Sequence, residues 1–134
     1  ARRVLEICLD RGPVGIVTDG PEVMQAAKVR ALGLEELGLH VVLSDALGGR
    51  DAWKPSPRGM LEVTRMMDVS PAATVYVGDN PAKDFLAARA AGMGSIRYRT
   101  ERQLHARVEP QAGAEPDAEV NSLTGALDLL AWEA

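Results

Sequence analysis

Residues 75–93 read VYVGDNPAKDFLAARAAGM, and this stretch contains the sequence signals of a strand, a polar turn and a helix in that order. The β-branched and aromatic residues 75–77 predict a short buried strand. Asn80 and Pro81 are typical of a helix start, and apolar residues then follow at helical spacing until Gly92 ends the helix. The stretch therefore predicts one strand–helix unit, the unit from which parallel sheets are built.

The same order of strand and helix recurs along the rest of the chain. Further strands are expected at 14–18, 41–43 and 95–98, and further helices at 2–9, 21–32, from Ser56-Pro57 through Met67, and from Leu123 to near Trp132. Strands separated by helices of this length form parallel sheets with right-handed connections. We therefore expect an α/β fold, a Rossmann-like parallel sheet of about four strands flanked by helices, in a single domain over residues 1–134. Residues 109–119, rich in Pro, Gly, Ala and acidic residues, are expected to form a flexible loop.

The composition excludes several classes of function. The 134 residues hold 15 Lys and Arg against 19 Asp and Glu, so a net charge of -4 argues against a nucleic-acid binder. No apolar run approaches the roughly 18 residues that a membrane span needs, so no membrane association is expected. A single cysteine, Cys8, fits a reducing compartment, and we expect a cytoplasmic protein.

Three polar clusters follow expected strands, where ligands bind in open parallel sheets. The first is Thr18-Asp19-Gly20, which lies between a strand and a helix that opens at Pro21. A hydroxyl group and exposed backbone N–H groups at a helix start can bind a phosphate. The alternative interpretation is an ordinary capped turn.

The second cluster contains Lys54, which is followed by Pro55. Proline restricts the residue before it to extended geometry, so the ammonium group is presented from a stiff loop and can neutralise a phosphoryl group. A solvated surface lysine is the alternative.

The third cluster holds Gly78, Asp79 and Asp84 at the end of the strand in residues 75–77. Two carboxylates at a helix start suit a hard cation such as Mg²⁺. Alternatively, Asn80 and Asp84 only cap the helix, which leaves Asp79 without an explanation.

In combination, these clusters resemble the haloacid dehalogenase-like (HAD) hydrolase superfamily. The longer stretches VGIVTDG, WKPSP and VYVGDNPAKDFLAARAAGM also resemble family sequence, and the likeness covers residues 4–98. Thr18 matches the second family motif, Lys54 the third, and Asp79 with Asp84 the fourth. The combination is far more specific than any one motif.

The resemblance implies a Mg²⁺-dependent phosphatase site that binds a small phosphorylated metabolite. Thr18 would hydrogen-bond the phosphoryl group, and Lys54 would neutralise its charge. Asp79 would bind Mg²⁺ directly, and Asp84 would be a second ligand or an orienting group. The implied substrate-binding set is Thr18, Asp19, Gly20 and Lys54.

One family motif is absent from the sequence. In the family the first motif, DxDx(T/V) at the end of a strand, supplies the nucleophilic aspartate and the general acid. Asp10 is no substitute, because it follows an expected helix and precedes an expected strand and is therefore expected in a turn. The resemblance places that strand between those at 14–18 and 75–78. Its omission leaves a slot of roughly 10 Å, because neighbouring strands lie about 4.8 Å apart. We expect an upstream segment to fill the slot; alternatively the two strands pair with each other, or a second chain donates a strand.

Two functions follow from these observations. The leading hypothesis is the C-terminal part of a HAD-like phosphatase, inactive without the upstream nucleophile. The alternative is a non-catalytic HAD-like module that binds a partner or a phosphorylated ligand. His40 and His105 lack companions at metal-ligand spacing, Asp45 is expected to cap a loop, and Cys8 is expected in the core.

Overall fold

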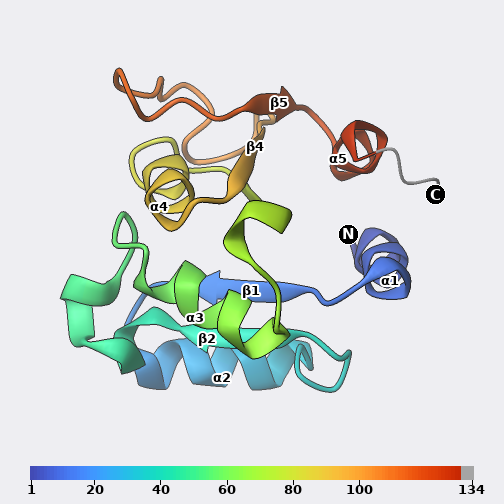
Figure 1. Ribbon diagram of the computed structural model, residues 1–134, viewed down its shortest axis with the longest axis vertical. Helices are drawn as coiled ribbons and strands as arrows, with labels where there is room; N and C mark the ends of the chain where they lie inside the picture. The colour runs from blue at the N-terminus through green and yellow to red at the C-terminus, as the bar shows by residue number, and fades with distance from the viewer. Residues whose placement is uncertain (131–134) are drawn as a thin grey trace.

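The computed structural model describes residues 1–130, and the end of the C-terminal helix expected near Trp132 lies outside them. Helices and strands alternate through most of this range (Figure 1). The elements are α1 (Arg2–Arg11), β1 (Gly15–Thr18), α2 (Glu22–Leu32), β2 (His40–Leu43), α3 (Arg58–Met67), β3 (Val75–Gly78), α4 (Asp84–Ala91), β4 (Gly94–Tyr98), β5 (Ala118–Val120) and α5 (Leu123–Leu129). Three short 3₁₀ helices cover Ser44–Leu47, Gly49–Ala52 and Pro71–Ala73.

The strands form two separate parallel sheets. β1 pairs with β2, from Gly15 opposite His40 to Thr18 opposite Leu43. β4 lies between β3 and β5 in the second sheet. In Figure 1 the first sheet occupies the lower half, and β4 and β5 the upper half. The parallel strands and flanking helices confirm the expected α/β fold. Within residues 1–130, β1 and β3 do not pair, so these two strands have not closed on each other.

The number of strands differs from the expectation, because the described residues contain five rather than about four. The additional strand, β5, begins inside the expected loop 109–119 and includes its last two residues. A strand of three residues with the charged Glu119 at its centre is too short and too polar to give a recognisable apolar pattern. Asp117 fixes the start of β5, since its carboxylate and its backbone N–H both bond the backbone of Ser95.

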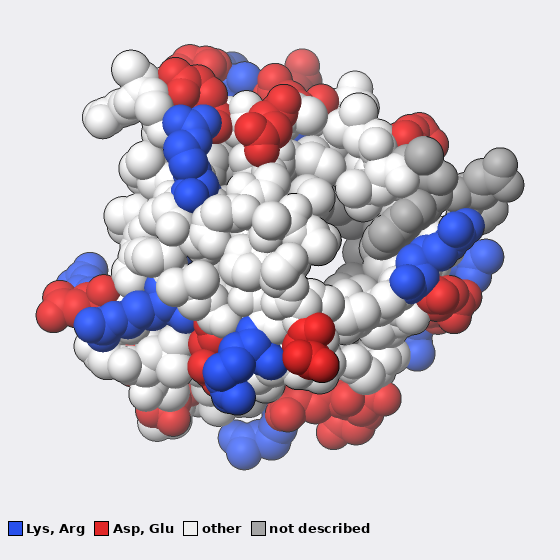
Figure 2. Space-filling view, viewed as in Figure 1, with Lys and Arg blue, Asp and Glu red and all other residues white. Residues whose placement is uncertain are grey.

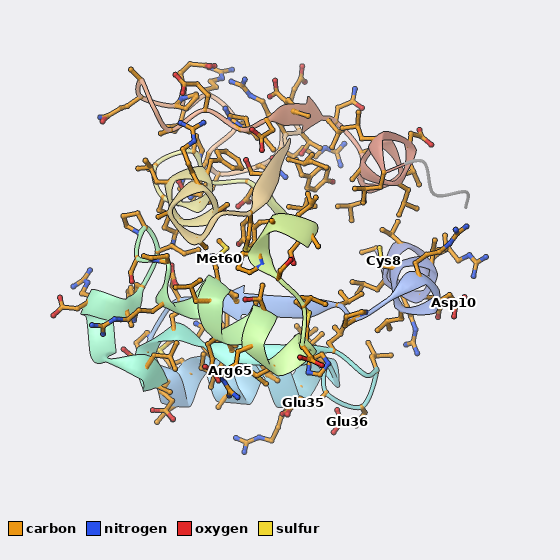
Figure 3. All side chains as sticks on the ribbon, viewed as in Figure 1. Cys8, Asp10, Glu35, Glu36, Met60 and Arg65 are labelled. Carbon is orange, nitrogen blue, oxygen red and sulfur yellow. The ribbon has the colours of Figure 1, made fainter. Side chains whose placement is uncertain are left out.

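Helix α3 connects the two sheets through its buried face. Val63 packs with Val17 and Val42 of the first sheet. One turn earlier, Met60 is fully buried in a cluster with residues of α4, and Figure 3 shows it between α3 and α4. Each such apolar side chain contributes about 1.5–3 kcal/mol when buried. The two sheets are therefore joined by helix packing where strand pairing is missing.

Three helices begin later than expected, each after a proline, and α2 begins at Glu22 rather than at Pro21. The helix expected from Asn80-Pro81 begins at Asp84, because residues 81–83 form turns in which Asn80 accepts backbone hydrogen bonds from Ala82 and Asp84. The helix expected to begin at Pro57, with Ser56 as its N-cap, begins at Arg58, and the Ser56 hydroxyl accepts a hydrogen bond from the Arg58 N–H.

The surface in Figure 2 carries basic and acidic side chains around its rim, with a central area that has neither. Within residues 1–130, none of the helices combines the length and apolar character needed to cross a membrane. Cys8 is only partly buried on α1, which differs from the expected core position, and burial raises the pKa of its thiol.

Candidate active site

A cavity of about 480 Å³ lies at the carboxyl ends of the strands. Five of the six residues singled out in the sequence line it: Thr18, Asp19, Lys54, Asp79 and Asp84. Gly20 is not among the lining residues. Its φ of 121° lies in the region that favours glycine, and a Cβ there would stand 2.5 Å from Gln25 Nε2, so it shapes the turn into α2.

Lys54 holds its ammonium group inside the protein, with the side chain only 9% exposed. Nζ donates to the backbone oxygen of Val17 at 3.3 Å and to the hydroxyl of Tyr76 at 2.9 Å. It also forms an ion pair with Asp84 Oδ1 at 3.4 Å. Burial alone lowers the pKa of Lys54, but Tyr76, Asp84 and Asp19 outweigh it, and the pKa lies above its usual value. The group is therefore a fixed positive charge at neutral pH.

Asp84 organises the turn that follows β3. Its Oδ2 accepts hydrogen bonds from the backbone N–H groups of Asp79 and Asn80, at 3.2 and 2.9 Å. A Cβ on Gly78 would stand 2.5 Å from the same oxygen, so glycine permits this close approach. The other oxygen, Oδ1, is buried without a hydrogen bond, and the Lys54 charge compensates it. This geometry favours the orienting role for Asp84 over direct metal ligation.

Asp19 connects the three clusters. Its Oδ1 accepts the backbone N–H of Lys54 at 3.2 Å, and its Oδ2 accepts the ammonium of Lys83 at 2.7 Å. Burial raises the pKa of Asp19, but Lys83 and Lys54 together lower it further, so the net pKa is below its usual value. The carboxylate is committed to the two lysines and does not point at a substrate as a free group.

Thr18 is held by a side chain that the sequence analysis did not single out. Its hydroxyl donates to Oε1 of Gln25 on α2 at 2.9 Å. The contact fixes the side chain of Thr18, which lines the same cavity as Lys54 and Asp79. The second and third motifs therefore reach one cavity, as the strand-end argument requires.

Asp79 is the carboxylate in the cavity with no side-chain hydrogen bond or ion pair to any of residues 1–130. Mg²⁺ takes about six oxygen ligands. Within that same range, no three His, Cys, Asp or Glu side chains lie close enough together to hold a metal ion. The residues present thus supply one free carboxylate and do not by themselves complete a magnesium site.

Other side chains have different roles from those of the motifs. Asp45 accepts the N–H of Glu22 at the start of α2 and the indole N–H of Trp53, so its expected capping role is confirmed. Tyr76, Lys83 and His105 also line the cavity, and the sequence analysis missed all three. Of the three, Lys83 could have been predicted from the sequence, because it lies between Asp79 and Asp84 in the third cluster.

Comparison with known proteins settles the family. A family model described as a haloacid dehalogenase-like hydrolase matches residues 1–92. This chain belongs to the HAD-like hydrolases. The resemblance inferred from the motifs is confirmed.

Relatives of this HAD-like chain include named phosphatases. A glyceraldehyde 3-phosphate phosphatase of Methanopyrus kandleri is 35% identical over 118 residues, which are 87% of this chain and 48% of the relative. A phosphoglycolate phosphatase of Xanthomonas campestris pv. campestris is 38% identical over 82 residues, 61% of this chain and 35% of the relative. The chain thus spans half or less of the length of these relatives.

Solved structures share the fold. A 2-haloacid dehalogenase from Pseudomonas syringae superposes with a TM-score of 0.75 at 31% identity, covering 98% of this chain and 51% of that one. A HAD family hydrolase from Deinococcus radiodurans, solved with bound phosphate and sodium, gives a TM-score of 0.78 at 21% identity, covering 97% and 56%. The second likeness concerns the fold alone.

Proposed function

We propose that this HAD-like chain supplies the phosphoryl-binding part of the active site of a Mg²⁺-dependent phosphatase that acts on a small phosphorylated metabolite. The observation that carries the proposal is the buried ammonium of Lys54 in one cavity with Thr18 and Asp79. The phosphatase names of two relatives support it.

The geometry suits binding of a phosphoryl group. Lys54 is fixed by three contacts and stays charged, so no reorganisation is needed when an anion arrives. Its side chain is nearly excluded from water. In such surroundings a charge interacts more strongly with a bound anion than it does in solvent. Thr18 adds a hydroxyl group at the cavity wall. These groups bind the phosphoryl oxygens and stabilise the charge that accumulates on them during transfer.

The site needs one more strand. Within residues 1–130, β1 pairs only with β2 and β3 only with β4, and Val17 of β1 and Val77 of β3 both line the cavity. We assign the space between them to a strand from an upstream segment or from a second chain. That strand would carry the nucleophilic aspartate that the family resemblance implies. It would also add the oxygens that Asp79 lacks for a magnesium site.

The ion pairs of the cavity carboxylates support an alternative function, a non-catalytic module. Among the described carboxylates of the cavity, Asp19 is bonded to Lys83 and Asp84 to Lys54. Neither is free to attack a phosphorus atom, and Asp79, the third carboxylate, is assigned to Mg²⁺. A chain that works without the additional strand would therefore bind phosphorylated ligands without hydrolysing them.

Hydrolysis of p-nitrophenyl phosphate with Mg²⁺ tests the two functions. We expect no turnover by the purified chain and turnover after addition of a segment that bears a DxDx(T/V) strand. Lys54→Ala should abolish that turnover. Lys28→Ala is the matched control, because Lys28 is exposed on α2 and the chain has only three lysines.

The outcomes separate the hypotheses. Turnover by the chain alone, lost on mutation of one of its own carboxylates, would show that the nucleophile has been assigned to the wrong segment. Phosphate binding without turnover, even with the segment present, would support the binding module instead.

A further inference from the structure

One wall of the cavity comes from a segment that no motif covers. Leu104 and His105, in the turns that follow β4, line the same cavity as Thr18 and Asp79. The side chain of Leu104 is 90% exposed, so burial in the core does not explain its position. The placement of this segment beside the site needs another physical cause.

That cause is a pair of arginines that bind the backbone of the segment. Arg97 of β4 is 2% exposed, and its guanidinium donates to the carbonyl oxygens of His105 at 3.0 Å and Val108 at 2.7 Å. Arg99 donates to the carbonyl of Ala106. Burying a guanidinium is costly unless it is hydrogen-bonded, and both hydrogen bonds of the Arg97 guanidinium go to this segment. Directed hydrogen bonds therefore hold His105 at the cavity.

The position of His105 relative to the phosphoryl-binding groups indicates its role. Thr18 is the last residue of β1, Lys54 comes after the 3₁₀ helix Gly49–Ala52 and Asp79 comes after β3, whereas His105 lies in the turns after β4. β4 pairs with β3 in the second sheet, whereas β1 belongs to the first. An imidazole has at least one N–H donor in either protonation state, so it can bind an oxygen acceptor at any pH near neutrality.

We propose that His105 is a substrate-recognition residue, which donates a hydrogen bond to an oxygen acceptor, such as a carboxylate, on the part of the substrate away from the phosphoryl group. This inference rests on the proposed function, since it requires a phosphoryl group at Thr18 and Lys54. Leu104 and His105, in the segment held by Arg97 and Arg99, are then the part of the cavity wall that carries this contact.

The test is an NMR titration with two matched ligands, 2-phosphoglycolate and ethyl phosphate, which differ in the carboxylate. Backbone amides of Thr18 and Gly20 report phosphoryl binding. The chain has only two histidines, so the ring signal of His105 reports the second contact, and that of His40 on β2 serves as an internal reference. We expect both ligands to shift the amides and only 2-phosphoglycolate to shift the His105 ring.

Three variants sharpen the test. His105→Ala should weaken 2-phosphoglycolate binding about tenfold, the loss of one hydrogen bond to a charged group, and change ethyl phosphate binding less than twofold. His105→Gln keeps an N–H donor and should recover most of the affinity. Arg102→Ala removes a positive charge from an exposed position in the same segment and should change neither affinity more than twofold.

Two results would overturn the inference, and they differ. Amide shifts at Thr18 with equal affinities for 2-phosphoglycolate in the wild type and in His105→Ala would refute the role of His105 and leave the proposed function standing. An absence of amide shifts with either ligand would refute phosphoryl binding, and the role of His105 with it.

Discussion

Removal of the Lys54 charge should destabilise the protein by leaving Asp84 buried without a counter-charge. The Asp84 side chain is 4% exposed, and its Oδ1 has the Lys54 ammonium at 3.4 Å and no hydrogen bond. Breaking a buried ion pair from one side costs about 3–5 kcal/mol. Lys54→Met, of similar length, should lower the free energy of unfolding by this amount, a large part of the roughly 5–15 kcal/mol of a typical domain.

A second substitution should recover part of that loss. Asp84→Asn keeps one oxygen to accept the N–H groups of Asp79 and Asn80 and removes the buried charge. The double variant Lys54→Met/Asp84→Asn should therefore be about 2–3 kcal/mol more stable than the sum of the two single losses implies.

Urea unfolding followed by tryptophan fluorescence measures the four stabilities of this cycle. Lys28→Met is the control, because this lysine is exposed on α2, and its substitution should change the midpoint little. Strict additivity of the two single losses would refute the argument, since it would mean that Asp84 gains nothing from the Lys54 charge.

Three more predictions follow from the same site. The pKa of Asp19 is lowered, so its contribution to stability is present above the usual value of 3.8 and is lost as the pH falls through the folded-state pKa. Lys83→Met should therefore move the acid-unfolding midpoint to higher pH. An unchanged midpoint would contradict this prediction. Mg²⁺ should bind weakly in calorimetry and more weakly still after Asp79→Asn, whereas tight binding that survives the substitution would exclude Asp79 as a ligand. The open edges of β1 and β3 should make unfolding of the isolated chain depend on protein concentration, and a concentration-independent transition of a clean monomer would contradict this.

The sequence predicted the convergence of the site because that convergence follows from topology. Thr18 is the last residue of β1 and Asp79 comes directly after β3, and parallel strands bring their carboxyl ends to one edge. Local signals also located most of the helices and strands, with errors at the helix starts after Pro57 and Pro81. At those places the geometry of the preceding turn determined the first helical residue, and apolar periodicity does not predict that geometry.

The sequence did not predict which partners fix each side chain. Lys83 bonds Asp19 across 64 positions of the chain, and Lys54 bonds Tyr76 across 22. Periodicity reports only which face of an element is apolar, so it contains no information on such distant pairs. The position of His105 depends on Arg97, whose burial follows from the packing around β4 and not from its neighbours in the sequence.

The sequence by itself determined the α/β class, the order of most elements and five of the residues that meet in the cavity, because apolar periodicity and strand-end positions are local properties of the chain. The tertiary structure decided that the strands divide into two sheets joined by α3, that Asp19 and Asp84 are occupied by lysines, and that His105 reaches the site. The joining of the sheets depends on apolar packing of α3. The other two features depend on buried polar and charged groups that find partners from distant elements. Such pairing is determined only when the whole chain packs, because an unpaired charge in the interior costs more free energy than any local preference can supply.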